Sequence, residues 1–76
     1  MMTLYVKRGC PWCVDAEAWL KKHEIPFTSA EVLSDPAAYR DMISLSGQSL
    51  APVLVDGDRV LADFGVEELP RFLGIG

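Results

Sequence analysis

The two cysteines of this chain, Cys10 and Cys13, are separated only by Pro11 and Trp12. A thiol acts as a nucleophile when it is ionised, and the first turn of a helix favours an anion because its N–H groups are unpaired and its dipole is positive there. Thiol pKa values at such positions fall to roughly 3.5–7.5 from about 8.5. A Cys-x-x-Cys sequence between a strand and a helix therefore indicates thiol–disulfide exchange.

The two thiols are expected to play different parts. Cys10 would stand at the helix cap, with Lys7 and Arg8 adding positive charge nearby, so its thiolate is predicted to attack a substrate disulfide. Cys13 would lie one helical turn further on, on the apolar face, and is predicted to resolve the mixed disulfide by attacking Cys10. An external reductant must then restore the dithiol.

Other roles for the cysteine pair fit the sequence less well. A disulfide across so short a loop constrains little of the unfolded chain, so it would stabilise the fold poorly. A structural zinc site needs four protein ligands, and beyond Cys10 and Cys13 the nearest further candidate is the single histidine, His23. We therefore expect no bound metal or cofactor, with an iron–sulfur cluster shared between two chains through Cys10 as an alternative.

The elements that must position the cysteines alternate between strand and helix. A helical pattern begins at Pro11, which is favourable at a first helical position, and places Cys13, Ala16 and Leu20 on one face, with Val14 beside it. In the second helix the expected apolar stripe is Ala38, Met42 and Leu45. In chain order we expect a strand at 4–6, a helix at 11–22, a strand at 27–32, a helix that follows the Asp35-Pro36 cap and ends at Gly47, a hairpin of strands 53–55 and 59–61, and a short helix at 66–73 that contains Pro70.

This order of elements predicts an α/β fold. The helix between the first two strands is a crossover, so those strands should run parallel, whereas the hairpin makes the last two antiparallel. One mixed four-stranded sheet with three helices on its faces is the simplest arrangement. We expect residues 1–76 to form a single domain, because a chain of 76 residues has no room for a second core.

Composition excludes several classes of partner. The formal net charge is −4 and the seven basic residues are scattered, which argues against nucleic acid because phosphate binding needs clustered positive charge. No apolar run is long enough to span a membrane. With no recognisable export signal and only two cysteines, a reducing cytoplasm is the expected compartment, and a monomer is the expected state.

The sequence resembles the glutaredoxins, a family of the thioredoxin superfamily. The resemblance covers nearly the whole chain, from residues 4–13 through 46–52 to the final helix. It implies a thioredoxin fold with sheet order 2-1-3-4, a cis proline that opens the third strand, and thiol exchange with glutathione or protein disulfides. The alternative interpretation of Pro52 is a trans proline at the start of an edge strand.

Several residues take an expected role from this resemblance. Lys7 corresponds to a family lysine that holds a glutathione carboxylate, and Trp12, next to Pro11, stands where the family usually has a tyrosine beside the reactive sulfur. Pro52 matches the cis proline of the family's Thr-Val-Pro. Here Ala51 precedes it, so a hydroxyl is missing, but the Ala51 backbone is still expected to pair with an extended substrate.

The chain departs from the family after the fourth strand. Members that use glutathione usually have two glycines, then a residue and an Asp or Ser, which bind the γ-glutamyl carboxylate; this chain has Ala62-Asp63-Phe64-Gly65. Asp63 opposes a carboxylate by like charge, unless it caps the last helix. The N–H groups of Phe64 and Gly65 are expected to remain available to an anion at that helix start.

Two versions of the function follow. The first is an oxidoreductase that reduces protein or glutathione mixed disulfides through the Cys-Pro-Trp-Cys dithiol, with glutathione as co-substrate. The alternative is a glutaredoxin-like redoxin that lacks the full glutathione pocket, takes electrons from thioredoxin reductase and serves ribonucleotide reductase or similar clients. Redoxins of that kind usually have other residues between the cysteines.

Overall fold

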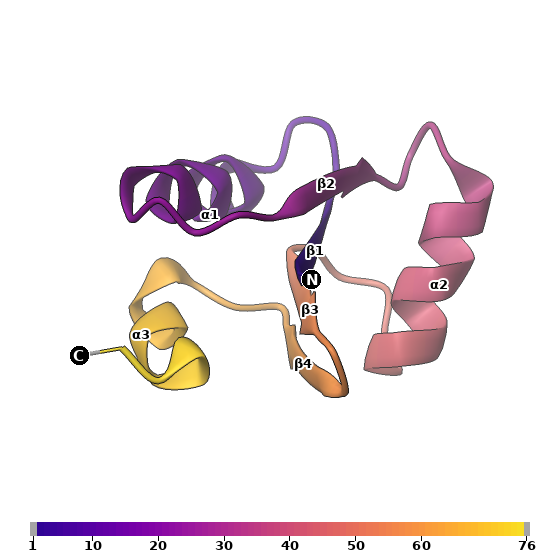
Figure 1. The fold of residues 1–76 in the computed structure, drawn as a ribbon. Coiled ribbons are helices and arrows are strands. Elements are labelled where there is room, and N and C mark those ends of the chain that lie inside the picture. The colour runs from indigo at the N-terminus through magenta and orange to yellow at the C-terminus, as the bar shows by residue number, and fades with distance from the viewer. Residues whose placement is uncertain (1, 76) are drawn as a thin grey trace.

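A computed structural model describes residues 2–75 of the chain. Its four strands form one mixed sheet in the order β2-β1-β3-β4, with helices on both faces (Figure 1), so the predicted thioredoxin fold with sheet order 2-1-3-4 is confirmed. The elements are β1 (Met2–Val6), α1 (Pro11–Lys22), β2 (Thr28–Glu31), α2 (Pro36–Ser46), β3 (Val53–Asp56), β4 (Arg59–Ala62), the 3-10 turn η1 (Val66–Glu68) and α3 (Leu69–Leu73).

The central strand β1 is apolar along three consecutive residues because both of its faces are covered. Leu4 and Val6 point to one side and pack in a cluster with Cys13 and Leu20 of α1. Tyr5 points to the other side and packs in a second cluster with residues of α2. The sheet therefore divides two small cores, one beneath α1 and α3 and the other beneath α2.

Strand pairing follows from how the strands are connected. Crossover through α1 makes β1 and β2 parallel, with Val6 opposite Glu31. The β3–β4 hairpin is antiparallel, as its Asp56-Gly57-Asp58 turn predicts. β1 and β3 are also antiparallel, so the end of β1 lies beside the start of β3.

The two long helices begin and end where the sequence predicts. The Asp35 carboxylate caps α2 by accepting hydrogen bonds from two backbone N–H groups, at 3.1 and 3.2 Å. Gly47 ends α2 with φ +71°, a left-handed conformation that glycine adopts without a steric penalty. Pro11 occupies the first turn of α1, and Cys10 is its N-cap.

Three expectations about these helices need correction. Residues 66–73 do not form one helix but a 3-10 turn followed by the short α3. Pro70 lies in the first turn of α3, because deeper in an α-helix its ring would clash with the carbonyl four residues before it. Val14 and Leu45, which the helical pattern places at or beside the apolar faces of α1 and α2, are 66% and 48% exposed.

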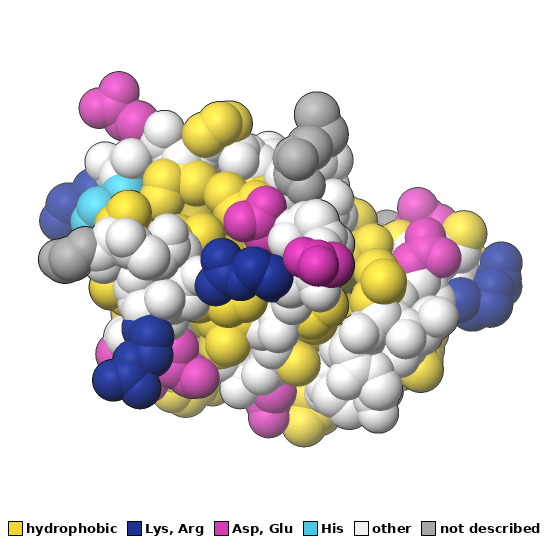
Figure 2. All heavy atoms as spheres, turned by 60° about the horizontal axis from the view of Figure 1, so that its bottom comes forward, with side chains coloured by type: hydrophobic (Ala, Val, Ile, Leu, Met, Phe, Trp, Pro, Cys, Tyr) yellow, Lys and Arg dark blue, Asp and Glu magenta, His cyan; other side chains and the backbone are white. Residues whose placement is uncertain are grey.

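Among residues 2–75 there is no helix with the length and apolar composition that crossing a membrane requires. In Figure 2 the basic side chains of the face shown stand apart from one another, with acidic and hydrophobic side chains between them.

Candidate functional site

Three loops meet at one end of the sheet. Because β1 and β3 are antiparallel, the loop that follows Val6 lies beside the segment that precedes Val53. Ala62, the last residue of β4, also pairs with Val53, so the Asp63–Gly65 corner leaves the sheet at the same end. The topology thus gathers the residues that the sequence singled out.

Cys10 stands at the start of α1 with its sulfur facing the first turn. Its Sγ accepts a hydrogen bond from the Cys13 N–H at 3.1 Å, and its carbonyl accepts from the N–H groups of Cys13 and Val14. The two cysteines form a disulfide, with Cα atoms 5.2 Å apart. Cys13 is only 2% exposed, whereas Cys10 is half-buried. Of the two sulfurs, that of Cys10 is the more open to a substrate.

Lys7 links the cysteine loop to the segment before β3. Its Nζ donates a hydrogen bond to the Ser49 carbonyl at 2.7 Å and lies 5.7 Å from the centre of the Tyr39 ring. Its own carbonyl accepts from the Cys10 N–H at 3.3 Å. An ammonium group has three donors, so two N–H groups of Lys7 remain beyond the bond to Ser49.

Glu31, at the end of β2, also supports the loop that follows β1. β2 lies on the side of β1 that faces away from β3. The Glu31 carboxylate accepts from the backbone N–H of Arg8 at 3.3 Å and lies 3.4 Å from the Arg8 guanidinium Nε. It also accepts from the Leu33 and Ser34 N–H groups and from the Ser34 hydroxyl, at 2.7–3.1 Å. The Ser34 hydroxyl bond is the main cause that holds the pKa of Glu31 below its ordinary value, aided by the backbone N–H groups of Leu33 and Arg8.

The Ala51–Pro52 peptide bond is cis, as the family resemblance implies. Pro52 is buried and precedes a central strand, so the alternative of a trans proline at a sheet edge is wrong. Ala51 and Cys10 are both partly buried and pack against the same cluster of core residues. Because β1 and β3 are antiparallel, the Ala51 segment lies at the same end of the sheet as the loop that holds the dithiol.

The Asp63 corner borders an open hollow of about 340 Å³ next to Trp12, which is 59% exposed. Asp63 has φ +51° and donates its N–H to the Pro52 carbonyl at 2.9 Å. It does not cap the last helical segment, because Gly65 does. The residues that line the hollow are Trp12, Asp63, Phe64, Gly65, Glu67 and Glu68.

The hollow has a negative character that the sequence only partly indicated. Glu68 accepts the Gly65 N–H through its Oε2 at 3.1 Å, so a carboxylate of the chain itself occupies one donor expected for an external anion. The Gly65 α-carbon faces the Glu67 carboxylate, since a Cβ there would meet Glu67 Oε2 at 2.5 Å. Three acidic side chains and no basic one line this hollow.

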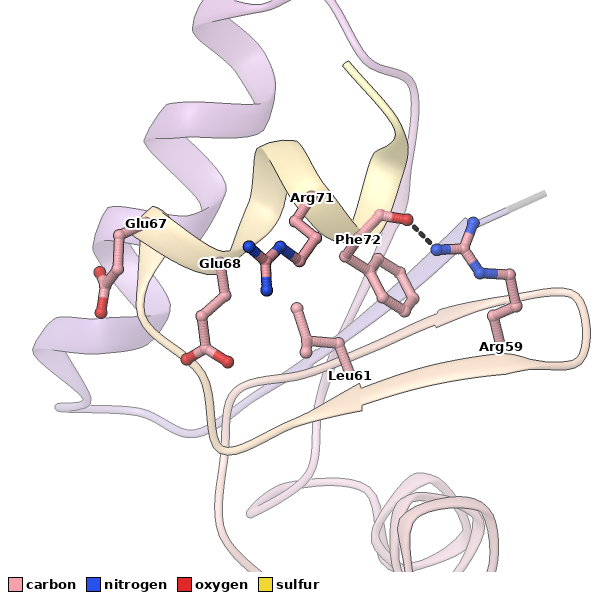
Figure 3. Close-up of a pocket in the computed structure, with 6 residues that line it drawn as sticks. All are labelled: Arg59, Leu61, Glu67, Glu68, Arg71 and Phe72. Atoms are coloured by element: carbon pink, nitrogen blue, oxygen red, sulfur yellow. Dashed lines mark hydrogen bonds between the residues drawn. The ribbon is translucent and has the colours of Figure 1, made fainter. Parts of the chain in front are cut away.

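A larger cavity lies further along α3 (Figure 3). Its volume is about 470 Å³, and its lining residues are Arg59, Leu61, Glu67, Glu68, Arg71 and Phe72. Arg59 donates to the Phe72 carbonyl, and its guanidinium lies 4.4 Å from the centre of the Phe72 ring. None of the site residues expected from the sequence lines this cavity, but Glu67 and Glu68 line both it and the hollow beside Trp12.

Sequence reasoning missed two supporting residues: Glu31, and Gln48, whose side-chain amide binds the backbone N–H and carbonyl of Leu50. Both act on backbone groups of a loop, and only the folded chain shows which loop is within reach. The Ser at position 34, three residues after Glu31, is a weak local signal for a carboxylate that binds the following turn. Within the described part of the chain, no three His, Cys, Asp or Glu side chains are grouped as metal ligands would be.

Comparison with known proteins agrees with this geometry. The sequence model of the Glutaredoxin family matches residues 2–61. An uncharacterised glutaredoxin-like 8.6 kDa protein in the rubredoxin operon of Clostridium pasteurianum is 32% identical over 74 residues, which are 96% of this chain and 97% of that protein.

Two solved structures have the same fold. A mutant of the thioredoxin-like protein BC3987 superposes with a TM-score of 0.89 at 26% identity, covering 96% of this chain and 99% of that one. NrdH-redoxin from Escherichia coli superposes with a TM-score of 0.77 at 21% identity, covering 92% of this chain and 91% of that one. Together with the Cys10–Cys13 disulfide, the sequence match indicates a glutaredoxin-like thiol redox function. The family match runs over most of the chain, and the chain belongs to the glutaredoxin family.

Proposed function

We propose that this chain is a dithiol oxidoreductase that reduces disulfides of protein clients, with Cys10 as the attacking thiol and Cys13 as the resolving thiol. The observation that carries this assignment is the difference between the two sulfurs. Cys10 caps α1, accepts the Cys13 N–H at 3.1 Å and is half-buried, whereas Cys13 is 2% exposed. The N–H group and the helix dipole favour a thiolate on Cys10.

The reaction moves two electrons and two protons from the dithiol to the client. The Cys10 thiolate attacks one client sulfur, a Cys10–client bond forms, and the client S–S bond breaks to release the first client thiolate. The Cys13 thiolate then attacks the Cys10 sulfur, which forms the Cys10–Cys13 disulfide present in the structure and releases the second client thiolate. One dithiol, or two monothiol molecules in succession, must then reduce this disulfide by the same exchange chemistry.

Residues around Cys10 are proposed to bind the client. The Ala51 backbone would pair with an extended segment of the client, while buried Pro52 holds that backbone beside the dithiol. Trp12 is 59% exposed, and Pro11 is also exposed, so both would contact the client chain that enters at Cys10. Lys7 would hold the edge of this surface through Ser49.

Substitution of each cysteine tests the assignment. Cys10→Ser should lower the rate of disulfide reduction to the uncatalysed rate, because no nucleophile remains at the accessible position. Cys13→Ser should retain the first step and accumulate a mixed disulfide between Cys10 and the client, visible as an added mass in non-reducing mass spectrometry. Thermal unfolding of both variants in the reduced state serves as the control for folding. Full activity of Cys10→Ser would refute the proposal.

We further propose that the electron source is a protein reductase of the thioredoxin reductase type rather than glutathione. The hollow beside Trp12 is lined by Asp63, Glu67 and Glu68, and Glu68 already binds the Gly65 N–H. Glutathione carries two carboxylates, and two like charges 4 Å apart repel by about 1 kcal/mol in water and more in a less polar environment. E. coli NrdH-redoxin, which shares this fold, is described as a glutaredoxin-like protein with a thioredoxin-like activity profile.

A coupled assay with two electron sources tests this second proposal. NADPH with thioredoxin reductase should sustain client reduction, whereas NADPH with glutathione and glutathione reductase should sustain it at a rate several-fold lower. Equal or faster turnover with glutathione would reverse the assignment of the reductant and leave that of Cys10 unchanged. Both systems operate in a reducing compartment, and we propose the cytoplasm as the place of action.

A further inference from the structure

Gln48 lies between α2 and β3, and its side-chain amide binds both backbone groups of one residue. Its Oε1 accepts the Leu50 N–H at 2.6 Å, and its Nε2 donates to the Leu50 carbonyl at 2.9 Å. The same Nε2 lies 3.1 Å from the Ser46 hydroxyl oxygen. That hydroxyl in turn donates to the Met42 carbonyl at 2.6 Å. Leu50 is thus connected to the last turn of α2 through two side chains.

The amide of Gln48 takes the place of a neighbouring strand for Leu50. Because the Leu50 N–H and carbonyl are already hydrogen-bonded to Gln48, they are not free to pair with a client. The next residue but one, Pro52, has no N–H, and its carbonyl accepts the Asp63 N–H at 2.9 Å. The Ala51 N–H and carbonyl take no part in the hydrogen bonds of residues 2–75 that involve this segment.

We propose that Gln48 is a positioning residue that makes Ala51 the pairing position within residues 50–52 for an extended disulfide client. The inference rests on the proposed function, because it concerns how the client reaches Cys10. Gln48 does not touch the reacting sulfurs. It fixes the backbone on one side of Ala51, while Asp63 and Pro52 fix it on the other side.

This role separates two kinds of substrate. An extended peptide disulfide needs the Ala51 backbone in one place, so releasing Leu50 should weaken its binding. A small disulfide such as hydroxyethyl disulfide has no peptide group to pair, so its reduction depends on Cys10 and Cys13 alone. Gln48 contributes two hydrogen bonds to Leu50, and their loss should raise the KM for the peptide about five- to thirtyfold.

Three substitutions test the inference in the full chain. Gln48→Ala removes both bonds to Leu50. Gln48→Glu keeps an acceptor for the Leu50 N–H but cannot donate to the Leu50 carbonyl when ionised, so its KM should fall between those of the wild type and Gln48→Ala. Ser44→Ala is the matched control, because Ser44 is exposed on α2 and its side chain forms no hydrogen bond within residues 2–75. Each protein is assayed with a disulfide-linked extended peptide and with hydroxyethyl disulfide.

We expect Gln48→Ala to raise the KM for the peptide while its kcat, and its rate with hydroxyethyl disulfide, change less than about twofold. Equal losses with both substrates would mean a general structural role and overturn the inference, as would an unchanged KM for the peptide. If Gln48→Ala proves unfolded, the difference between the two substrates is measured with Gln48→Glu instead. A wild-type protein that reduces neither substrate would refute the proposed function itself, which is a different result.

Discussion

Two regions border the dithiol, and they use their charged and polar groups in different ways. In the first, Lys7 and Gln48 direct their donors to backbone carbonyls of Ser49 and Leu50. In the second, Asp63 and Glu67 line an open hollow with carboxylates that receive no hydrogen bond within residues 2–75. In the first region the side-chain donors are paired within the protein. In the second region the carboxylates remain available to act on a molecule that approaches Cys10.

The difference bears on what each region can recognise. A segment with a fixed backbone suits a partner that offers its own backbone, which is common to all extended peptides. A region with unpaired like charges discriminates by charge, because it repels anions and favours neutral or cationic groups. The first region is therefore suited to recognise a peptide backbone, and the second region is suited to recognise charge. That division can be tested by changing one region while the other stays intact.

Neutralising the second region should improve the use of glutathione. Asp63→Asn combined with Glu67→Gln removes two negative charges and leaves the bond between Glu68 and Gly65 in place. Asn also tolerates the left-handed backbone that Asp63 adopts at φ +51°. Each removed charge is worth up to about 1 kcal/mol in water. We expect the KM for glutathione, measured with glutathione reductase as the coupling enzyme, to fall about three- to tenfold.

Salt and a matched variant separate this effect from a general one. The gain should shrink between low ionic strength and about 0.15 M salt, where the Debye length falls to about 8 Å. Glu17→Gln combined with Asp58→Asn changes the net charge equally, but on α1 and in the β3–β4 turn, outside the hollow. A similar fall of KM in this control would show that net charge acts from any position and that the hollow has no special part.

The comparison also shows which parts of the molecule the sequence could predict. Local signals were sufficient for the helix starts and ends: Asp35 caps α2, Gly47 ends it, and Pro11 opens α1. The Cys-x-x-Cys position and the hairpin turn are local in the same sense. The family resemblance supplied the sheet order and the cis bond before Pro52, which no local pattern specifies.

What could not be predicted depends on contacts between distant segments. The Lys7 ammonium binds Ser49, which is 42 positions away, and Glu31 binds the N–H of Arg8, 23 positions away. Leu45 fits an apolar helical stripe but is 48% exposed, because periodicity does not say where a covering element ends. The interruption before α3 had a local cause in Pro70, yet the sequence alone did not reveal that a 3-10 turn would precede it.

The smallest effect is expected from Glu31, whose carboxylate supports the first region because it accepts the N–H of Arg8, the neighbour of Lys7. Its pKa is held below the ordinary value of 4.5, chiefly by the Ser34 hydroxyl and further by the Leu33 and Arg8 N–H groups. A lowered pKa in the folded state means that ionised Glu31 stabilises the fold above the unfolded pKa. This contribution is lost as the pH falls through the lower, folded value. Glu31→Gln should lower the melting temperature slightly at pH 7 and by progressively less below about pH 4.5.

Thermal unfolding followed by circular dichroism between pH 7 and pH 3 measures this change, with Glu17→Gln as the control because Glu17 makes no hydrogen bond or ion pair within residues 2–75. Since the Arg8 side chain is 70% exposed, its ion pair with Glu31 contributes little, and the hydrogen bonds that Glu31 accepts from backbone N–H groups must carry the effect. High salt should therefore leave the difference between wild type and Glu31→Gln almost unchanged. A difference that vanishes in high salt would mean that Glu31 acts by charge, as the acids of the hollow do, and the contrast between the two regions would fail.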